Sequence, residues 1–273
     1  MRLKTIILSL AIALGTLCAQ AQNLDLLTRE QARELVGILC RQASTIPESD
    51  MENVTGLSGI SVIARAIDDS TVEMKYTLPD YVGDNSPEFK AFTMILMSGG
   101  GTVMTPLQIH TFTGVFRKAS YNIRATYTNG ADQSCSVDLT PDLLEKLWSG
   151  DLKGAGIDPG LARKGLLKSF NTDEINSLSQ FGIGTLDVRL DGRWVSLNLI
   201  LGDISGLNAL PKEEIRKLLL EEYASAPVIS KMAGAMVNAS DFIGLDGLKI
   251  SYEDKTESSD PIYLTWSELM NNR

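Results

Sequence analysis

The chain has 273 residues, of which 44% are apolar, so it is long and apolar enough to bury a hydrophobic core. Its 34 acidic and 25 basic residues give a formal net charge of −9, and no cluster of Lys or Arg interrupts this acidic balance. A net negative surface repels phosphate backbones and anionic lipid headgroups, so we expect neither nucleic acid nor a membrane surface as a partner.

The first 21 residues have the pattern of a secretory signal peptide. A basic start with Arg2 and Lys4 precedes a short apolar run from Ile6 to Leu17. Ala19-Gln20-Ala21 then fits the small-x-small cleavage pattern, and the apolar run is too short for a stable anchor. We expect cleavage after residue 21, a mature net charge of −11 and a soluble protein in a periplasm or outside the cell. An uncleaved anchor and a lipid on Cys18 are the alternatives.

The first half of the mature chain predicts a helix, a hairpin, a broken helix, a second hairpin and a short helix. Thr28 and Gln31 have capping-box spacing, and apolar residues recur at helical spacing up to Pro47. Residues 60–67 and 72–78 form the hairpin, and the second of these strands alternates apolar and polar residues. Helical pieces at 86–97 and 106–118 follow, then a hairpin from Ile123 and a helix from Thr140.

The second half repeats this order after a glycine-rich segment, residues 150–160, which is the best linker candidate. A helix at 161–170 precedes another that begins at Asn171 or Thr172. A hairpin then turns at Asp191-Gly192, and a helix beginning at Pro211 is interrupted at Pro227. A hairpin from residue 248 and a helix capped at residue 265 end the chain.

Two stretches of the sequence match each other at a constant offset. Ile123-Arg124-Ala125-Thr126-Tyr127 corresponds to Leu248-Lys249-Ile250-Ser251-Tyr252, and Val137-Asp138-Leu139-Thr140 corresponds to Ile262-Tyr263-Leu264-Thr265. The earlier hairpins match at an offset that differs by only two residues. Because five elements recur in the same order, we interpret the chain as a duplication.

These repeats predict an α+β fold built as a tandem duplication. Each copy is a helix–hairpin–broken helix–hairpin–helix unit, with an antiparallel sheet of about four strands and helices packed on one face. The predicted organisation is a signal peptide at 1–21, a first unit at 22–149, a linker at 150–160 and a second unit at 161–273. Each unit is large enough to fold alone, although the two could also share one core or one sheet.

The two mature cysteines, Cys40 and Cys135, both lie on faces that we expect to point into the first core. In an oxidising compartment they could form a disulfide, worth roughly 4–5 kcal/mol in the chain-entropy model. The alternative is two buried thiols, because cysteine also packs as a small apolar residue.

No motif in the chain carries a recognisable catalytic or metal-binding arrangement. His110 is the only histidine, and we interpret it as a surface or capping residue because no nucleophile or metal motif accompanies it. The Ser98-Gly99-Gly100-Gly101 run lacks the Gly-Lys-Ser/Thr of a phosphate-binding loop, so we expect a helix break and no nucleotide cofactor. We therefore expect no catalytic, cofactor-binding or metal-binding residues.

Acidic and aromatic residues leave two further options open. Asp187, Asp191 and the acidic loop 253–260 resemble weak calcium sites, but we favour exposed strand edges and a solvated loop. A glycosidase could draw two carboxyls from such residues, although the sequence cannot select the pair. The three tryptophans, at 148, 194 and 266, are expected to pack half-buried rather than to form a binding hot spot.

The sequence therefore favours a non-catalytic role. We expect an exported envelope protein that binds a protein or another envelope component, or that has a structural role. The alternative is a carboxylate-based hydrolase that acts on an envelope or extracellular polymer.

Overall fold

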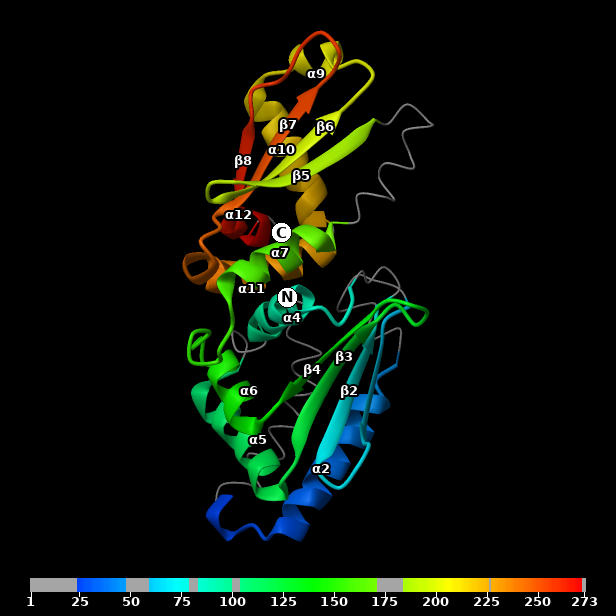
Figure 1. Ribbon diagram of the computed structural model, residues 1–273, viewed down its shortest axis with the longest axis vertical. Helices are drawn as coiled ribbons and strands as arrows, with labels where there is room; N and C mark the ends of the chain where they lie inside the picture. Colours follow the sequence, from blue (N-terminus) through cyan, green and yellow to red (C-terminus); the bar gives the residue numbers. More distant parts are fainter. Residues whose placement is uncertain are drawn as a thin grey trace. The chain divides into compact units, whose positions relative to one another are not determined.

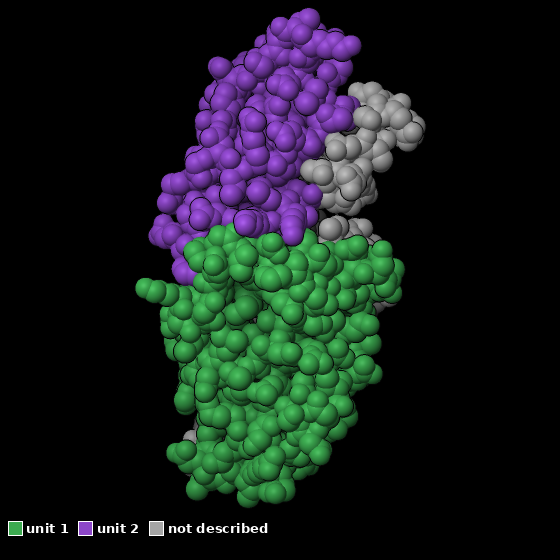
Figure 2. All heavy atoms as spheres, viewed as in Figure 1, with its two compact units in different colours: residues 1–162 green, residues 163–273 purple. Residues whose placement is uncertain are grey.

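The computed structural model describes residues 24–47, 59–78, 83–99, 104–170, 184–225 and 227–271 (Figure 1). The expected signal peptide with its cleavage site, the glycines at 100 and 101, and the start of the helix expected at residue 171 or 172 lie outside these residues. The chain divides into two compact units, residues 1–162 and 163–273 (Figure 2). Among the described helices, none combines the length and the apolar character that crossing a membrane requires.

The first unit contains both predicted hairpins and the predicted helices. Its described elements run in the order η1 (Leu24–Leu26), α2 (Arg29–Ser44), β1 (Ser61–Ala66), β2 (Thr71–Thr77), α4 (Pro87–Ser98), α5 (Pro106–Ala119), β3 (Asn122–Thr128), β4 (Ser134–Leu139) and α6 (Pro141–Trp148). Each α-helix begins after a Ser or Thr whose hydroxyl accepts a backbone N–H three residues on; these caps are Thr28, Ser86, Thr105 and Thr140. The capping signals in the sequence therefore mark the helix starts.

The first sheet has the strand order β1-β2-β3-β4. Its two hairpins are antiparallel, as expected, but β2 and β3 pair in parallel, with Thr71 opposite Asn122. The expectation of an all-antiparallel sheet is thus wrong at the central pair. The physical reason is the connection: α4 and α5 carry the chain back across the sheet, and such a crossover brings the next strand in parallel.

One face of this sheet is apolar and covered by helices. Val72, Ile123 and Leu139 lie side by side across three strands and are almost fully buried. Helices α2, α4 and α6 contact the outer strands, and α5 contacts α2 and α6. On the opposite face, Arg124 donates to Asp138 at 2.7 Å. The alternation of side chains therefore gives one core face and one polar face, as the sequence predicts.

Side chains close part of the outer edges of the first sheet. The Ser44 hydroxyl accepts from the Ala64 N–H at 2.8 Å and donates to the Ala64 carbonyl at 3.0 Å, on the outer edge of β1. On β4, the side-chain oxygen of Asn85 accepts from the Ser136 N–H at 2.9 Å. At the offset of 125, Ser136 corresponds to Pro261, which has no N–H to offer. These features restrict pairing of the edges with other chains.

The second unit repeats this architecture. It contains most of α7 (Pro159–Ser169), then β5 (Thr185–Asp191), β6 (Trp194–Ile200), α9 (Ser205–Asn208), α10 (Lys212–Ser225), α11 (Pro227–Ile243), β7 (Gly247–Glu253), β8 (Ile262–Thr265) and α12 (Trp266–Asn271). The strand order is β5-β6-β7-β8, again with two antiparallel hairpins joined by a parallel central pair. The fold is therefore α+β in two similar halves, and a duplication of the sequence stays our interpretation of that similarity.

The ends of α5 and α11 give a residue-level match between the halves. Ser120 and Gly244 follow these helices with φ angles of 58° and 66°, in the left-handed region. The next N–H in each unit donates to the carbonyl five residues earlier, Phe116 in α5 and Ser240 in α11, both at 3.0 Å. This is the Schellman arrangement of a helix C-terminus, and it makes Phe116 and Ser240 corresponding positions.

The glycine-rich segment, residues 150–160, lies at the end of the first unit and is a series of turns with its own buried side chains. Leu152, Ala155 and Ile157 are each less than a tenth exposed. The Asp158 carboxylate accepts from the N–H groups of Gly160 and Leu161 at 2.7 and 3.0 Å, at the start of α7. The segment is therefore held by local hydrogen bonds and packing.

Candidate functional site

The single histidine lies on the surface of α5 in an ion-pair network with α6. Its Nδ1 is 3.2 Å from Oε1 of Glu145. The other oxygen of Glu145 accepts from Arg117 at 2.8 Å and from the Thr113 hydroxyl at 3.2 Å. Arg117 also donates to Asp142 at 2.6 Å. The interpretation of His110 as a surface residue fits this arrangement, in which the polar groups join two helices.

Glu145 is the most enclosed acid of this network, and two opposing effects act on its pKa. Partial burial raises the pKa of the carboxyl, whereas the hydrogen bonds from Arg117, His110 and Thr113 lower it. The net shift is downward, so the carboxylate is ionised at neutral pH and its charge is used in binding α5 to α6.

The two cysteines are buried thiols in different parts of the first core. Cys40 lies on α2, which contacts β1 and α5, and burial raises the pKa of its thiol. Cys135 lies on β4, and its Sγ accepts from the Thr93 hydroxyl of α4 at 3.6 Å. Of the two arrangements that the sequence leaves open, the structure contains the thiols.

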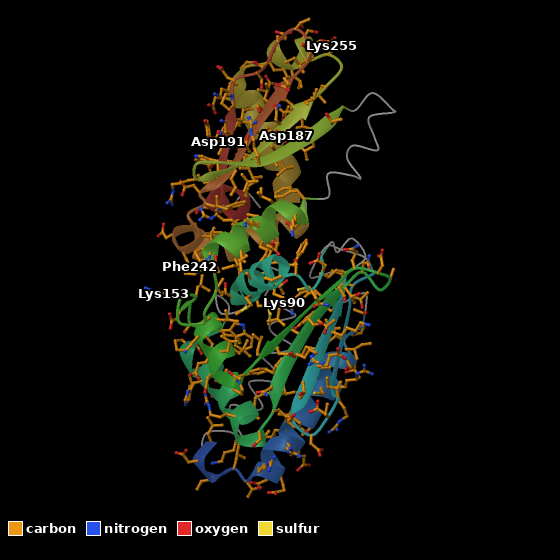
Figure 3. The ribbon with its side chains drawn as sticks, viewed as in Figure 1. Lys90, Lys153, Asp187, Asp191, Phe242 and Lys255 are labelled. Atoms are coloured by element: carbon orange, nitrogen blue, oxygen red, sulfur yellow. The ribbon has the colours of Figure 1, made fainter. Side chains whose placement is uncertain are left out.

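Two of the acidic residues considered for calcium or for hydrolysis, Asp191 and Asp254, are engaged in local contacts. Figure 3 shows Asp187 and Asp191 along β5, and Asp191 forms an ion pair with Lys249 of β7. Asp254 accepts from the backbone N–H groups of Thr256 at 2.7 Å and Ile204 at 3.1 Å, and hydrogen bonds to Thr256 lower the pKa of Asp254. Within the described part of the chain, no three His, Cys, Asp or Glu side chains gather as a metal site would require.

The three tryptophans have different environments. Trp148 packs against Phe112 with ring centroids 5.2 Å apart, and its indole N–H donates to the Met97 carbonyl. Trp266 is 1% exposed and donates to the Leu245 carbonyl at 3.0 Å. Trp194 is only half-buried. Packing therefore accounts for two of the tryptophans, and the third is different.

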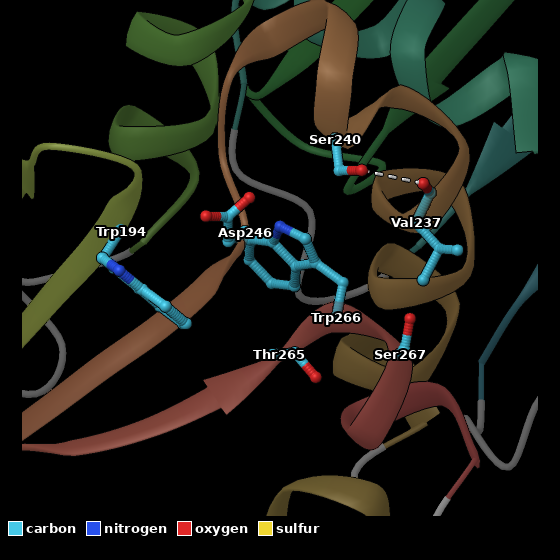
Figure 4. Close-up of a pocket in the computed structure, with 7 residues that line it drawn as sticks. All are labelled: Trp194, Val237, Ser240, Asp246, Thr265, Trp266 and Ser267. Carbon is cyan, nitrogen blue, oxygen red and sulfur yellow. Dashed lines mark hydrogen bonds between the residues drawn. The ribbon is translucent and has the colours of Figure 1, made fainter.

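Trp194 lines a pocket in the second unit with a volume of about 300 Å³ (Figure 4). The pocket lies where the start of β6, the last turns of α11, the start of β7 and the junction of β8 with α12 meet. Its lining residues are Trp194, Val237, Ser240, Asp246, Thr265, Trp266 and Ser267. The lining thus combines two indole rings, three hydroxyl groups and one carboxylate.

Polar contacts hold the rim of this pocket in place. Asp246 accepts from Nε and Nη2 of Arg193 at 2.8 and 2.6 Å, and these bonds are the main cause of a lowered pKa for Asp246. The Thr265 hydroxyl accepts from the backbone N–H of Glu268 at 3.3 Å, which caps α12. The carboxylate in the pocket is therefore ionised and already neutralised by a guanidinium group.

Sequence reasoning missed this pocket because its residues are scattered over more than 70 positions of the chain. One signal was present: Trp194 begins the strand two residues after Gly192, on the face of the strand that alternation assigns to solvent. Alternation therefore places a large aromatic ring on the polar face of the sheet, away from the core side chains of the same strand.

Comparison of the chain with protein-family models, with curated proteins and with solved structures finds no match in any of the three.

Proposed function

We propose that the protein is an exported, non-catalytic binding protein of the cell envelope, and that the pocket at Trp194 is its binding site. The observation that carries this proposal is a local difference between two similar halves. Where the first unit has the fully buried Phe116, the second has the half-buried Ser240 in the lining of a pocket. The first unit buries this position completely, so the fold does not need an open position there to be stable. The pocket at the same position of the second unit is therefore available for binding a ligand.

The chemistry of the lining favours binding over hydrolysis. A glycosidase of the usual kind needs two carboxyls about 5–10 Å apart that face the same bond. Of the residues that line the pocket, only Asp246 carries a carboxyl, and Arg193 binds both of its oxygens. The proposed export rests on the pattern of the first 21 residues.

Retention on envelope material tests this function. Mature protein, residues 22–273, would be passed over immobilised cell-wall polysaccharide, peptidoglycan and extracted envelope proteins. We expect saturable retention on one of these materials with no change in it, and at least tenfold weaker retention for Trp194→Ala.

The matched control is Thr71→Ala, because Thr71 begins β2 as Trp194 begins β6 and lies outside the pocket. Retention of this variant should equal that of the parent. Absence of retention on all three materials, or release of reducing ends or amines from the retained polymer, would contradict the proposal.

A further inference from the structure

We propose that the Trp194 pocket takes one ring of a neutral saccharide, an inference that rests on the proposed binding function and names its ligand. The argument uses the size of the pocket, its aromatic surface, its hydrogen-bonding groups and its charge. Each of these limits the ligand independently.

The size of the pocket fits a single small ring. Ligand pockets in proteins commonly measure about 300–1,000 Å³, so a volume of about 300 Å³ is at the lower end. At the corresponding position the first unit has Phe116, whose ring stacks on Phe112 with centroids 4.7 Å apart, whereas the second unit has the smaller Ser240 in the pocket lining. A phenylalanine at position 240 would carry a ring into the space that the ligand needs.

Trp194 offers an aromatic surface whose orientation is fixed. Tyr263 of β8 packs against it edge-on, with ring centroids 4.9 Å apart and an interplanar angle of 69°. Figure 4 shows Trp194, Asp246 and Trp266 among the side chains that line the pocket. A fixed indole beside polar groups suits a ligand that has an apolar face and a polar rim, as a pyranose ring does.

The polar groups of the lining suit hydroxyl groups in particular. Ser267 is exposed, and its hydroxyl both donates and accepts. The Ser240 hydroxyl donates to the Val237 carbonyl at 3.1 Å, which leaves its oxygen as an acceptor. Asp246 adds a carboxylate acceptor, and the indole N–H of Trp194 is a donor. A ligand hydroxyl, which is donor and acceptor at once, can match such a mixture.

The charge of the pocket favours a neutral ligand. Asp246 is bound by both nitrogens of Arg193, so its charge is compensated before any ligand arrives. Glu268, next to the lining residue Ser267, is paired with Arg216. A cationic ligand would have to compete with Arg193 for Asp246, and an anionic ligand would meet no positively charged side chain among the lining residues. Both charged classes are therefore disfavoured.

Titration with small probes tests the ligand class. The probes are glucose, galactose, mannose, N-acetylglucosamine and cellobiose, with choline and acetate as charged probes, followed by tryptophan fluorescence and calorimetry. We expect at least one neutral saccharide to bind saturably and more tightly than either charged probe. Trp194→Ala and Ser240→Phe should each weaken this binding at least tenfold, whereas Trp194→Phe retains a ring and should lose less.

Thr71→Ala is the matched control and should bind as the parent does, and circular dichroism of each variant checks the fold. Tighter binding of choline or acetate, or equal affinity in Trp194→Ala and the parent, would overturn the assignment. No response to any saccharide would also overturn it. If the parent protein is still retained on envelope material, the binding function stands and only the ligand class fails.

Discussion

At the scale of single residues, the polar side chains of this protein mostly serve the scaffold. Glu145 receives hydrogen bonds from three side chains of α5 and thereby fixes α6. Asp254 and Asn129 occupy corresponding positions, and each accepts backbone N–H groups within its own hairpin loop. Trp194 differs from these residues, because its half-buried side chain lines the pocket.

Glu145 should make stability depend on pH. Its pKa in the folded protein is below the ordinary value of 4.5 for a glutamate, so its contribution to stability is present above pH 4.5 and is lost as the pH falls through the folded pKa. We expect Glu145→Gln to cost about 1 kcal/mol at pH 7 and progressively less below pH 4.5. Urea unfolding from pH 7 to pH 3 measures this.

The control for Glu145 is Asp142→Asn. Asp142 shares the same arginine but its side chain is 72% exposed, so we expect a loss below about 0.5 kcal/mol. A difference between Glu145→Gln and the parent that stays constant down to pH 3 would show that its charge does not act through this network.

Ser120 and Gly244 follow α5 and α11 with positive φ angles, so replacing the serine by glycine and the glycine by serine should change stability in opposite directions. Ser120 adopts φ 58° with a side chain, whereas Gly244 adopts φ 66° without one and has open space around a built Cβ. Ser120→Gly should therefore stabilise the protein by about 0.5 kcal/mol, and Gly244→Ser should destabilise it by about 1 kcal/mol. Thermal unfolding of both variants measures the difference, and a loss of stability in Ser120→Gly would be inconsistent with backbone strain there.

The cysteines should titrate as two thiols. We expect the same thiol titre in denaturant before and after treatment with a reductant, because the structure contains both as buried thiols. A titre that rises by two after reduction would instead establish the disulfide.

At the scale of elements, the sheets depend on side chains at their edges. Ser44 replaces the missing neighbour of β1 at Ala64, with one hydrogen bond in each direction. The corresponding protection on β4 comes from Asn85, and Pro261, directly before β8, has no N–H donor to protect. The two halves thus solve the same edge problem by different residues.

Ser44→Ala tests the protection of the β1 edge. We expect a loss of about 1 kcal/mol and faster hydrogen exchange at the Ala64 amide, because the bond to that amide is removed. Thr45→Ala is the control, since the hydroxyl of Thr45 donates only to Gln42 within its own helix turn. If the Ala64 amide exchanges at the same rate in Ser44→Ala and Thr45→Ala, Ser44 does not protect this edge.

The sequence predicted elements well where the signal was local. The alternation in 72–78, the threonine caps and the Asp191-Gly192 turn all act over a few residues, and the corresponding strands and helices are present. The parallel pairing of Thr71 with Asn122 was missed, because it depends on the path of the connecting helices rather than on either strand. The short helix α9 was also missed, because no side chain caps its start and the sequence therefore contains no capping signal for it.

At the scale of the whole molecule, the two compact units give corresponding core positions that can be compared directly. Leu139 in β4 and Leu264 in β8 are both fully buried and correspond at the offset of 125. We expect alanine at either position to cost about 2–5 kcal/mol, and to raise hydrogen exchange mainly in its own unit. Hydrogen exchange followed by mass spectrometry, on peptides from 59–162 and 184–271, measures both the loss of stability and the unit in which exchange increases.

Equal increases of exchange in both units after either leucine substitution would show that the chain unfolds as one cooperative body. The same measurement bears on the predicted organisation, because a boundary near residue 162 should separate peptides that respond to Leu139→Ala from those that respond to Leu264→Ala.

The parallel central pair of each sheet also has a consequence for the order of folding. The outer hairpins close over a few residues, but Val72 meets Ile123, and Val195 meets Leu248, across connections of about 50 residues, and such distant contacts form slowly. We therefore expect each sheet to be completed at its centre, and the rate of folding to be limited by the middle of the sheet rather than by its turns. Until the central pair forms, we expect apolar strand surface to stay exposed.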